Sequence, residues 1–311
     1  MRTGEDQLMR DTWLTICSCA VLLALLVLVL GARLLPLLLL VPLGYAVWRL
    51  LWRAPAAARP QPLTGLLLAP PLGLAACLLL NLILDFSGAS FIRFLLPACV
   101  LAAYGAVMLL RDLVAAETAL RRCWRAAWPA AITGMAAVLL LAGLLTATPN
   151  RFMGGADDGG YTSTIYSFYE RGGLTVELPL LTELAGVVEP RRLMPISYTQ
   201  ADHPGRAVPI HPLGFPLMAA PLYEIARQLI APLDAVMLPY QFCGLWALVL
   251  VMAVAREVHG WRMAMVVGLL LAVNWLQVWL ARSAFGEMPL QLFGMAVLWL
   301  LLRARRHDDL R

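Results

Sequence analysis

Long apolar runs separated by short polar turns dominate the chain. Hydropathy predicts about eight membrane-spanning helices, because most of these runs reach the roughly 17–25 residues that cross a bilayer. The runs carry few charges, and they cover residues 13–30, 34–52, 63–84, 92–110, 128–147, 234–254, 263–281 and 288–302. Only residues 148–233 depart from this pattern. We therefore expect an all-α, polytopic transmembrane protein with one long external loop that carries short juxtamembrane helices.

The composition agrees with this class. Hydrophobic residues make up 61% of the chain and charged residues 14%, and the mean hydropathy is +0.77, which is typical of an integral membrane protein. All 24 basic residues are arginine. Their excess does not indicate a nucleic-acid partner, since basic residues in membrane proteins mostly set topology. The six cysteines lie in or beside apolar runs, a context that indicates neither a zinc site nor a disulfide framework.

The arginine distribution orients the predicted spans. If the N-terminus is cytoplasmic, 15 of the 24 arginines flank cytoplasmic span ends, whereas the short outside turns hold only Arg33, Arg93 and Arg282. This distribution predicts a multi-pass protein of the cell (inner or plasma) membrane. Its N-terminus and its tail, residues 303–311, are then cytoplasmic.

Residues 211–232, "HPLGFPLMAAPLYEIARQLIAP", decide whether this orientation holds. Three prolines interrupt the segment, and Glu224 and Arg227 lie near its end. These features favour a helix at the membrane interface, with apolar residues toward the bilayer and charged residues toward water. Residues 148–233 then form one external loop, and the turn at 282–287 faces the same compartment.

Two adjacent acids, Asp157 and Asp158, lie in the glycine-rich stretch "GGADDGGY". Aromatic and apolar residues spaced by three to four predict a short helix over 161–171, whose N-terminal end favours ionised carboxylates. The glycines allow unusual backbone angles and a close approach by a bulky ligand. An ionised aspartate can accept a proton from an attacking hydroxyl or amine, or hold a divalent cation. A solvated turn that caps the helix explains the same residues without any chemistry.

A third acid, Glu287, follows Arg282 in the turn "RSAFGEMPL" between two apolar runs. A carboxylate at membrane depth is costly unless it is paired, hydrated or used in function. An ion pair with Arg282, or a place at the N-terminus of a helix, is the structural alternative. His203 and His211 lie in the long loop, but their spacing matches no ligand motif, so no metal ligand is predicted.

Three motifs in this order resemble those of the GT-C membrane glycosyltransferases, in the branch of protein mannosyltransferases and aminoarabinose transferases. The D-[DE]-x-x-Y motif of that family is matched by Asp157-Asp158-Gly159-Gly160-Tyr161. Its H/Y-P-P-x-x-P-L-type juxtamembrane segment is similar to "PIHPLGFPLMAAPLY", and its R-x-x-x-x-[DE]-x-P-L element to "RSAFGEMPL". The resemblance covers roughly residues 128–302.

The resemblance implies transfer of a sugar from a polyprenyl-phosphate donor to an acceptor on the non-cytoplasmic face. The membrane lipid and the lipid-linked sugar are then the partners, and the requirement for a divalent cation stays open. Asp157 would be the general base or would orient the acceptor, and Asp158 and Glu287 complete the implied catalytic set. Tyr161, His211 and Arg282 would bind substrate.

The resemblance leaves residues 1–127 as a four-span extension before a GT-C-like module at 128–302. Members of the family usually continue through several more spans, so the sequence suggests a truncated, split or degenerate enzyme. Two other classes stay open. One is a non-catalytic assembly subunit that binds a partner membrane subunit, and the other is a transporter or lipid-binding protein. Acids in loops rather than at mid-bilayer favour the enzyme.

Overall fold

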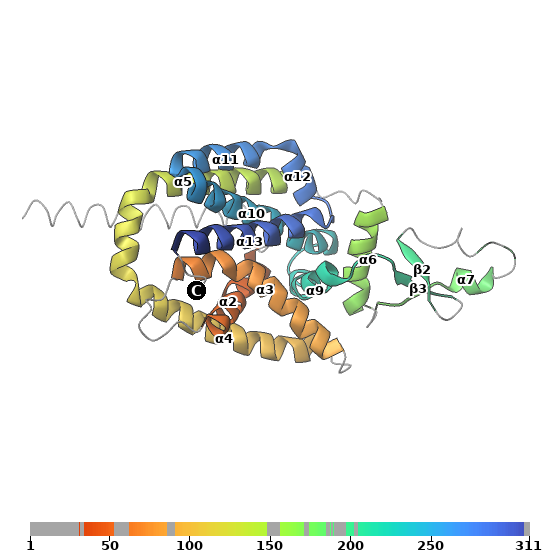
Figure 1. Cartoon of the computed structure of the whole chain (residues 1–311). Helices are drawn as coiled ribbons and strands as arrows, with labels where there is room; N and C mark the ends of the chain where they lie inside the picture. The colour runs from red at the N-terminus through yellow and green to blue at the C-terminus, as the bar shows by residue number, and fades with distance from the viewer. Residues whose placement is uncertain are drawn as a thin grey trace, which may run out of the picture.

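The computed structural model is built almost entirely of helices, with one small sheet (Figure 1). It describes residues 31, 34–52, 62–85, 91–147, 156–170, 174–184, 187, 189, 197–201 and 205–307. The helices are α2 (Leu34–Leu51), α3 (Pro62–Asp85), α4 (Phe91–Ala115), α5 (Glu117–Ala147), α6 (Ala156–Glu170), α7 (Pro179–Glu183), α9 (Gly214–Ala226), α10 (Pro232–His259), α11 (Trp261–Val273), α12 (Trp275–Ala281) and α13 (Glu287–His307). The strands are β1 (Val176–Glu177), β2 (Tyr198–Gln200) and β3 (Arg206–Pro209).

Among the described residues, four helices are long and apolar enough to cross a membrane. These candidate spans are Pro62–Leu84, Phe94–Ala115, Pro232–His259 and Glu287–Arg305, and α11 with α12 makes a bent fifth. The prediction of a helical protein with several apolar spans is therefore confirmed, whereas a count of eight is not. Two further predicted spans correspond to the shorter apolar helices Leu39–Leu51 and Ile132–Ala147, and the run at 13–30 lies outside the described residues.

The predicted single span at 263–281 is broken at Asn274, where α11 and α12 meet at 64°. Asn274 has an extended backbone (φ −66°, ψ 121°), and its side-chain oxygen accepts a hydrogen bond of 3.1 Å from the Gln277 amide. Asparagine in this role starts a new helix, because its side chain satisfies an amide that has no partner in the first turn. The bend places the end of α12 beside the start of α13.

Helices α2, α3 and α4 touch through backbone where glycine leaves no side chain. A Cβ at Gly44 would lie 1.7 Å from the carbonyl oxygen of Ala69, and one at Gly105 would lie 1.8 Å from that of Pro42. Small residues allow this approach, which is a common basis of helix packing in membranes. A buried polar contact joins the same helices, because the Tyr45 hydroxyl donates a 2.6 Å hydrogen bond to Asp112.

Two hydrogen bonds between helices compensate for prolines. Pro221 has no amide hydrogen to donate to the carbonyl of Leu217 one turn earlier, and the Asn81 side chain of α3 donates to that oxygen instead at 2.6 Å. In the same way Pro71 leaves the Leu67 carbonyl without its helical donor, and the Trp246 indole of α10 donates to it at 2.9 Å. Backbone groups at membrane depth need such partners, so these contacts join α3 to α9 and to α10.

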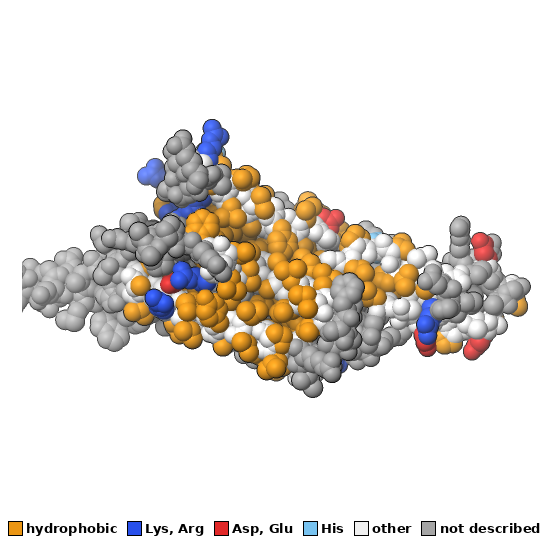
Figure 2. Space-filling model, turned by 60° about the horizontal axis from the view of Figure 1, so that its bottom comes forward, with side chains coloured by type: hydrophobic (Ala, Val, Ile, Leu, Met, Phe, Trp, Pro, Cys, Tyr) orange, Lys and Arg blue, Asp and Glu red, His pale blue; other side chains and the backbone are white. Residues whose placement is uncertain are grey.

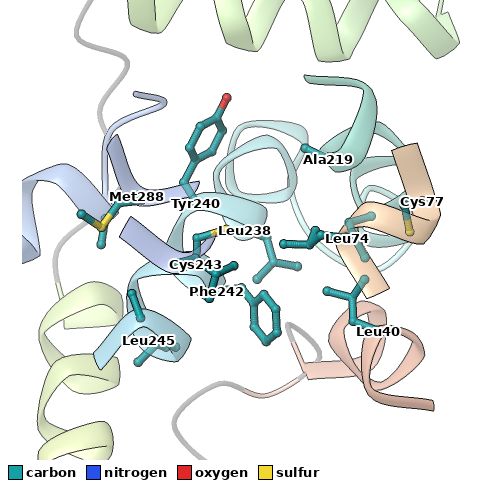
Figure 3. Close-up of a cluster of buried hydrophobic side chains, with 14 of the residues drawn as sticks. Leu40, Leu74, Cys77, Ala219, Leu238, Tyr240, Phe242, Cys243, Leu245 and Met288 are labelled. Carbon is teal, nitrogen blue, oxygen red and sulfur yellow. The ribbon is translucent and has the colours of Figure 1, made fainter. Parts of the chain in front are cut away.

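One apolar core joins the N-terminal helices to the rest of the described chain (Figure 3). Leu40 of α2 and Leu74 of α3 lie in the same cluster as Leu238 of α10 and Met288 of α13. Helix α5 runs without interruption through position 127, where the sequence suggested a boundary between an extension and a module.

Apolar side chains also cover a broad outer face of the molecule (Figure 2). On α4, for example, Leu96, Leu110 and Val114 are 70%, 63% and 73% exposed. A face of this kind is favourable only against another apolar phase, which agrees with a membrane location.

Helix α9 carries the segment that was predicted to lie at the membrane interface. With 13 residues it is too short to span a bilayer, as the sequence suggested. Its acid does not face water, however, so the prediction is wrong for Glu224, whereas Arg227, directly after the helix, is half-buried. Glu224 is buried, and Arg227 binds it through a 2.8 Å hydrogen bond to Oε1. The carboxylate tolerates burial because the guanidinium next to it compensates its charge.

Between α6 and α9 the chain forms a three-stranded antiparallel sheet in the order β1-β3-β2. Tyr198 pairs with Pro209 in the β2–β3 ladder, and the Ile210 amide donates a 3.0 Å hydrogen bond to the Ser197 carbonyl beside that pair. The sheet lies on the far side of α6 from the main group of helices (Figure 1). Its last strand in the sequence, β3, ends at Pro209, two residues before His211.

Candidate functional site

Three segments that carry candidate site residues meet at one place. The ring of Tyr161, in the first half of α6, lies 5.2 Å from the ring of His211, which follows β3. The Tyr161 hydroxyl oxygen also lies 3.6 Å from the position that a Cβ on Gly286 would take. Gly286 directly precedes Glu287. Tyr161 therefore connects the His211 segment with the turn between α12 and α13.

Helix α6 approaches His211 closely because residue 160 is glycine. A Cβ on Gly160 would lie 2.5 Å from His211 Cδ2 and 2.6 Å from Ser197 Cβ. We had expected the glycines to allow unusual angles in a loop. At Gly160 this is wrong, because the residue is helical and its φ is not positive. The helix begins at Ala156 and not near Tyr161. Because Gly160 has no side chain, His211 and Ser197 can pack against the helix at this position.

The two adjacent acids occupy the first turn of α6. Asp157 precedes Tyr161 by one helical turn, which is about 6 Å along the axis. The side chains of Asp157 and Asp158 lie outside the described residues. The N-terminal end of a helix favours negative charge, because the amide groups of its first turn have no partners within the helix.

The turn between α12 and α13 is held by its own hydrogen bonds. The Ser283 amide donates to the Leu280 carbonyl at 3.2 Å, and the Ser283 hydroxyl donates to the Trp279 carbonyl at 2.9 Å. Arg282 begins this turn and is half-buried, whereas Glu287 begins α13 with an exposed side chain. The Glu287 carboxylate thus lies at a helix N-terminus, where its negative charge is favourable.

The structure thus brings together Tyr161, His211 and the turn that holds Arg282 and Glu287. Sequence reasoning missed Ser197, whose Cβ packs at the same point of α6. No local signal marks this serine, because its conformation depends on how the hairpin of β2 and β3 closes. Among the described residues no three histidine, cysteine, aspartate or glutamate side chains gather as a metal site. The side chains of both acids of α6, with Asp202 and His203, lie outside that part of the chain.

The apolar helices and the polar cluster at the N-terminal half of α6 define a helical membrane protein with a candidate binding site. Comparisons with models of protein families, with curated proteins and with solved structures find no match to the chain.

We predict that Gly160→Ala destabilises the protein, because the new methyl group overlaps His211 and Ser197. Overpacking of this kind costs about 1–3 kcal/mol, although alanine is the better helix former by up to about 1 kcal/mol. Thermal unfolding of purified protein in detergent measures the change. Gly214→Ala is the matched control, since a Cβ there meets nothing within 4 Å. Equal unfolding temperatures for the two variants would contradict the close packing of α6 on His211.

Proposed function

We propose that this protein is an integral membrane glycosyltransferase of the cell membrane. It moves a sugar from a polyprenyl-phosphate donor to an acceptor on the non-cytoplasmic face, and its N-terminus is cytoplasmic. The observation that supports this function best is the meeting of Tyr161, His211 and the turn before Glu287. These segments lie far apart in the sequence, and each belongs to one of the three motifs that resemble the GT-C family.

The surroundings of the site suit a lipid-linked donor. A polyprenyl chain needs an apolar phase, and the helices present a broad apolar face to it (Figure 2). The sugar and phosphate need polar groups. The N-terminal half of α6 and the turn after α12 supply them. The Tyr161 and His211 rings provide flat faces and hydrogen-bonding atoms for a sugar. Arg282 is suited to the phosphate, because its planar guanidinium can donate two parallel hydrogen bonds to phosphate oxygens.

The proposed reaction is a substitution at the anomeric carbon of the donor sugar. The acceptor oxygen or nitrogen forms a bond to this carbon while the bond from the carbon to the phosphate oxygen breaks. Polyprenyl phosphate leaves with the bonding electrons, and the acceptor proton passes to the Asp157 carboxylate. Asp158 and Glu287 orient the acceptor, and Arg282 compensates the charge on the departing phosphate.

Transfer assays with purified protein in detergent test this function against a panel of polyprenyl-phosphate sugars. In these assays we expect Arg282→Lys to raise the KM for the donor about tenfold, because lysine keeps the charge but loses the planar pair of donors. Arg262→Lys is the control, because Arg262 is exposed at the start of α11, the helix before α12. A wild-type protein that transfers no sugar from any donor, yet binds a partner membrane subunit, would reject the proposal in favour of an assembly role.

A further inference from the structure

Ser197 has an unfavourable backbone conformation. Its φ is +76°, and it is the only non-glycine residue with a positive φ in the described part of the chain. A side chain makes this left-handed conformation costly, whereas glycine adopts it freely. The hairpin holds it in place, because the Ile210 amide donates a hydrogen bond to the Ser197 carbonyl at 3.0 Å. Strain of this kind persists where the surrounding structure imposes it, and it is common at binding sites.

The Ser197 side chain is buried without the hydrogen bond that burial normally requires. The residue is only 6% exposed, and its hydroxyl oxygen has no hydrogen-bond partner among the described residues. A buried hydroxyl without a partner is unfavourable, and such groups are rare in folded proteins. Two unfavourable features therefore coincide at one residue.

The position of Ser197 supplies a reason for both features. Its Cβ lies 2.6 Å from the place that a Cβ on Gly160 would take, and His211 Cδ2 lies 2.5 Å from the same place. Ser197 therefore packs on α6 at Gly160, the residue directly before Tyr161. His211 packs at the same point. Ser197 thus belongs to the same cluster as the two rings.

We propose that Ser197 is a sugar-binding residue of this site and that its hydroxyl forms a hydrogen bond with a hydroxyl group of the donor sugar. This inference rests on the proposed glycosyltransferase function and adds a residue that no motif marks. The neighbours favour the sugar over the phosphate, because Ser197 lies beside Gly160 and the ring of His211, which itself contacts the Tyr161 ring. Arg282, the arginine suited to phosphate, lies in the turn after α12 and not in the hairpin that holds Ser197.

The test compares the binding of two lipids to the full-length protein in detergent: a polyprenyl-phosphate sugar and polyprenyl phosphate alone. We expect Ser197→Ala to weaken binding of the sugar-bearing lipid about tenfold, the effect of one lost hydrogen bond in a buried site, and to leave binding of the bare lipid unchanged. Thr199→Ala is the matched control, because it removes a hydroxyl from an exposed residue of the neighbouring strand.

Thermal unfolding separates a binding role from a structural one. Ser197→Ala should unfold at or above the wild-type temperature, since it removes a buried hydroxyl that has no partner among the described residues. Ser197→Gly should unfold at a higher temperature still, because it also removes the backbone strain. A lower unfolding temperature for Ser197→Ala would overturn the inference, because the hydroxyl would then stabilise the fold. Equal weakening for both lipids would overturn the assignment to the sugar.

Failure of this inference differs from failure of the proposed function. If wild-type protein prefers the sugar-bearing lipid and Ser197→Ala retains the full preference, only the role of Ser197 is rejected. If wild-type protein binds neither lipid, both proposals are rejected together.

Discussion

Asp157→Asn is expected to abolish the proposed sugar transfer while the protein still folds and inserts into the membrane. Asparagine keeps the shape of the side chain and one acceptor oxygen, but it cannot take a proton from the acceptor nucleophile. Loss of a general base lowers rates by about 10²–10⁴-fold. The measurement is kcat with a polyprenyl-phosphate sugar that the wild-type protein uses.

Asp158→Asn is the matched comparison, because it makes the same chemical change at the next position of the first turn of α6. We expect a smaller loss there, since Asp158 is assigned to placing the acceptor and not to taking its proton. Equal unfolding temperatures for both variants and the wild type would show that the fold is intact. Full activity in Asp157→Asn would reject Asp157 as the base.

Gly44→Ala is expected to disrupt the packing of α2 on α3. The new methyl carbon would lie 1.7 Å from the Ala69 carbonyl oxygen, 2.5 Å from its carbon and 2.6 Å from the Gly73 amide nitrogen. All three are backbone atoms, so no rotation of a side chain can relieve the overlap and the helices must separate. We expect a loss of about 3 kcal/mol or more, at the upper end for overpacked cores.

The lower unfolding temperature and the yield of monodisperse protein in detergent measure this effect. Gly294→Ala in α13 is the control, because a Cβ there meets nothing within 4 Å. It should be neutral or stabilising, since alanine is favoured over glycine in a helix by up to about 1 kcal/mol. A Gly44→Ala protein as stable as this control would contradict the close contact of α2 and α3.

Hydropathy alone located the candidate spans, because a helix satisfies its backbone groups internally and its tendency to cross a bilayer depends on its own residues. The runs at 63–84, 92–110, 234–254 and 288–302 correspond to helices that are long enough to do so. The break at Asn274 was also readable in principle, because asparagine followed three residues later by glutamine is a helix-start pattern. Its apolar surroundings concealed that signal.

The candidate site was only partly predictable. The family resemblance singled out Tyr161, His211 and Glu287, and the predicted topology put their segments on the same side of the membrane. Local pattern did not show that the Tyr161 ring lies beside His211, or that Gly160 serves their packing. It also gave no indication of Ser197, whose positive φ results from the closure of a hairpin.

The sequence by itself determined the class of this protein and the positions of its apolar helices, since both follow from the residues of each segment. The tertiary structure decided how those helices support one another. Pro71 and Pro221 look like weak points in α3 and α9, yet Trp246 and Asn81 supply the missing hydrogen bonds from other helices. The burial of Glu224 beside Arg227 and the approach of α6 to His211 were decided in the same way. Each of these contacts depends on which elements pack together, and no periodicity within a single segment records it.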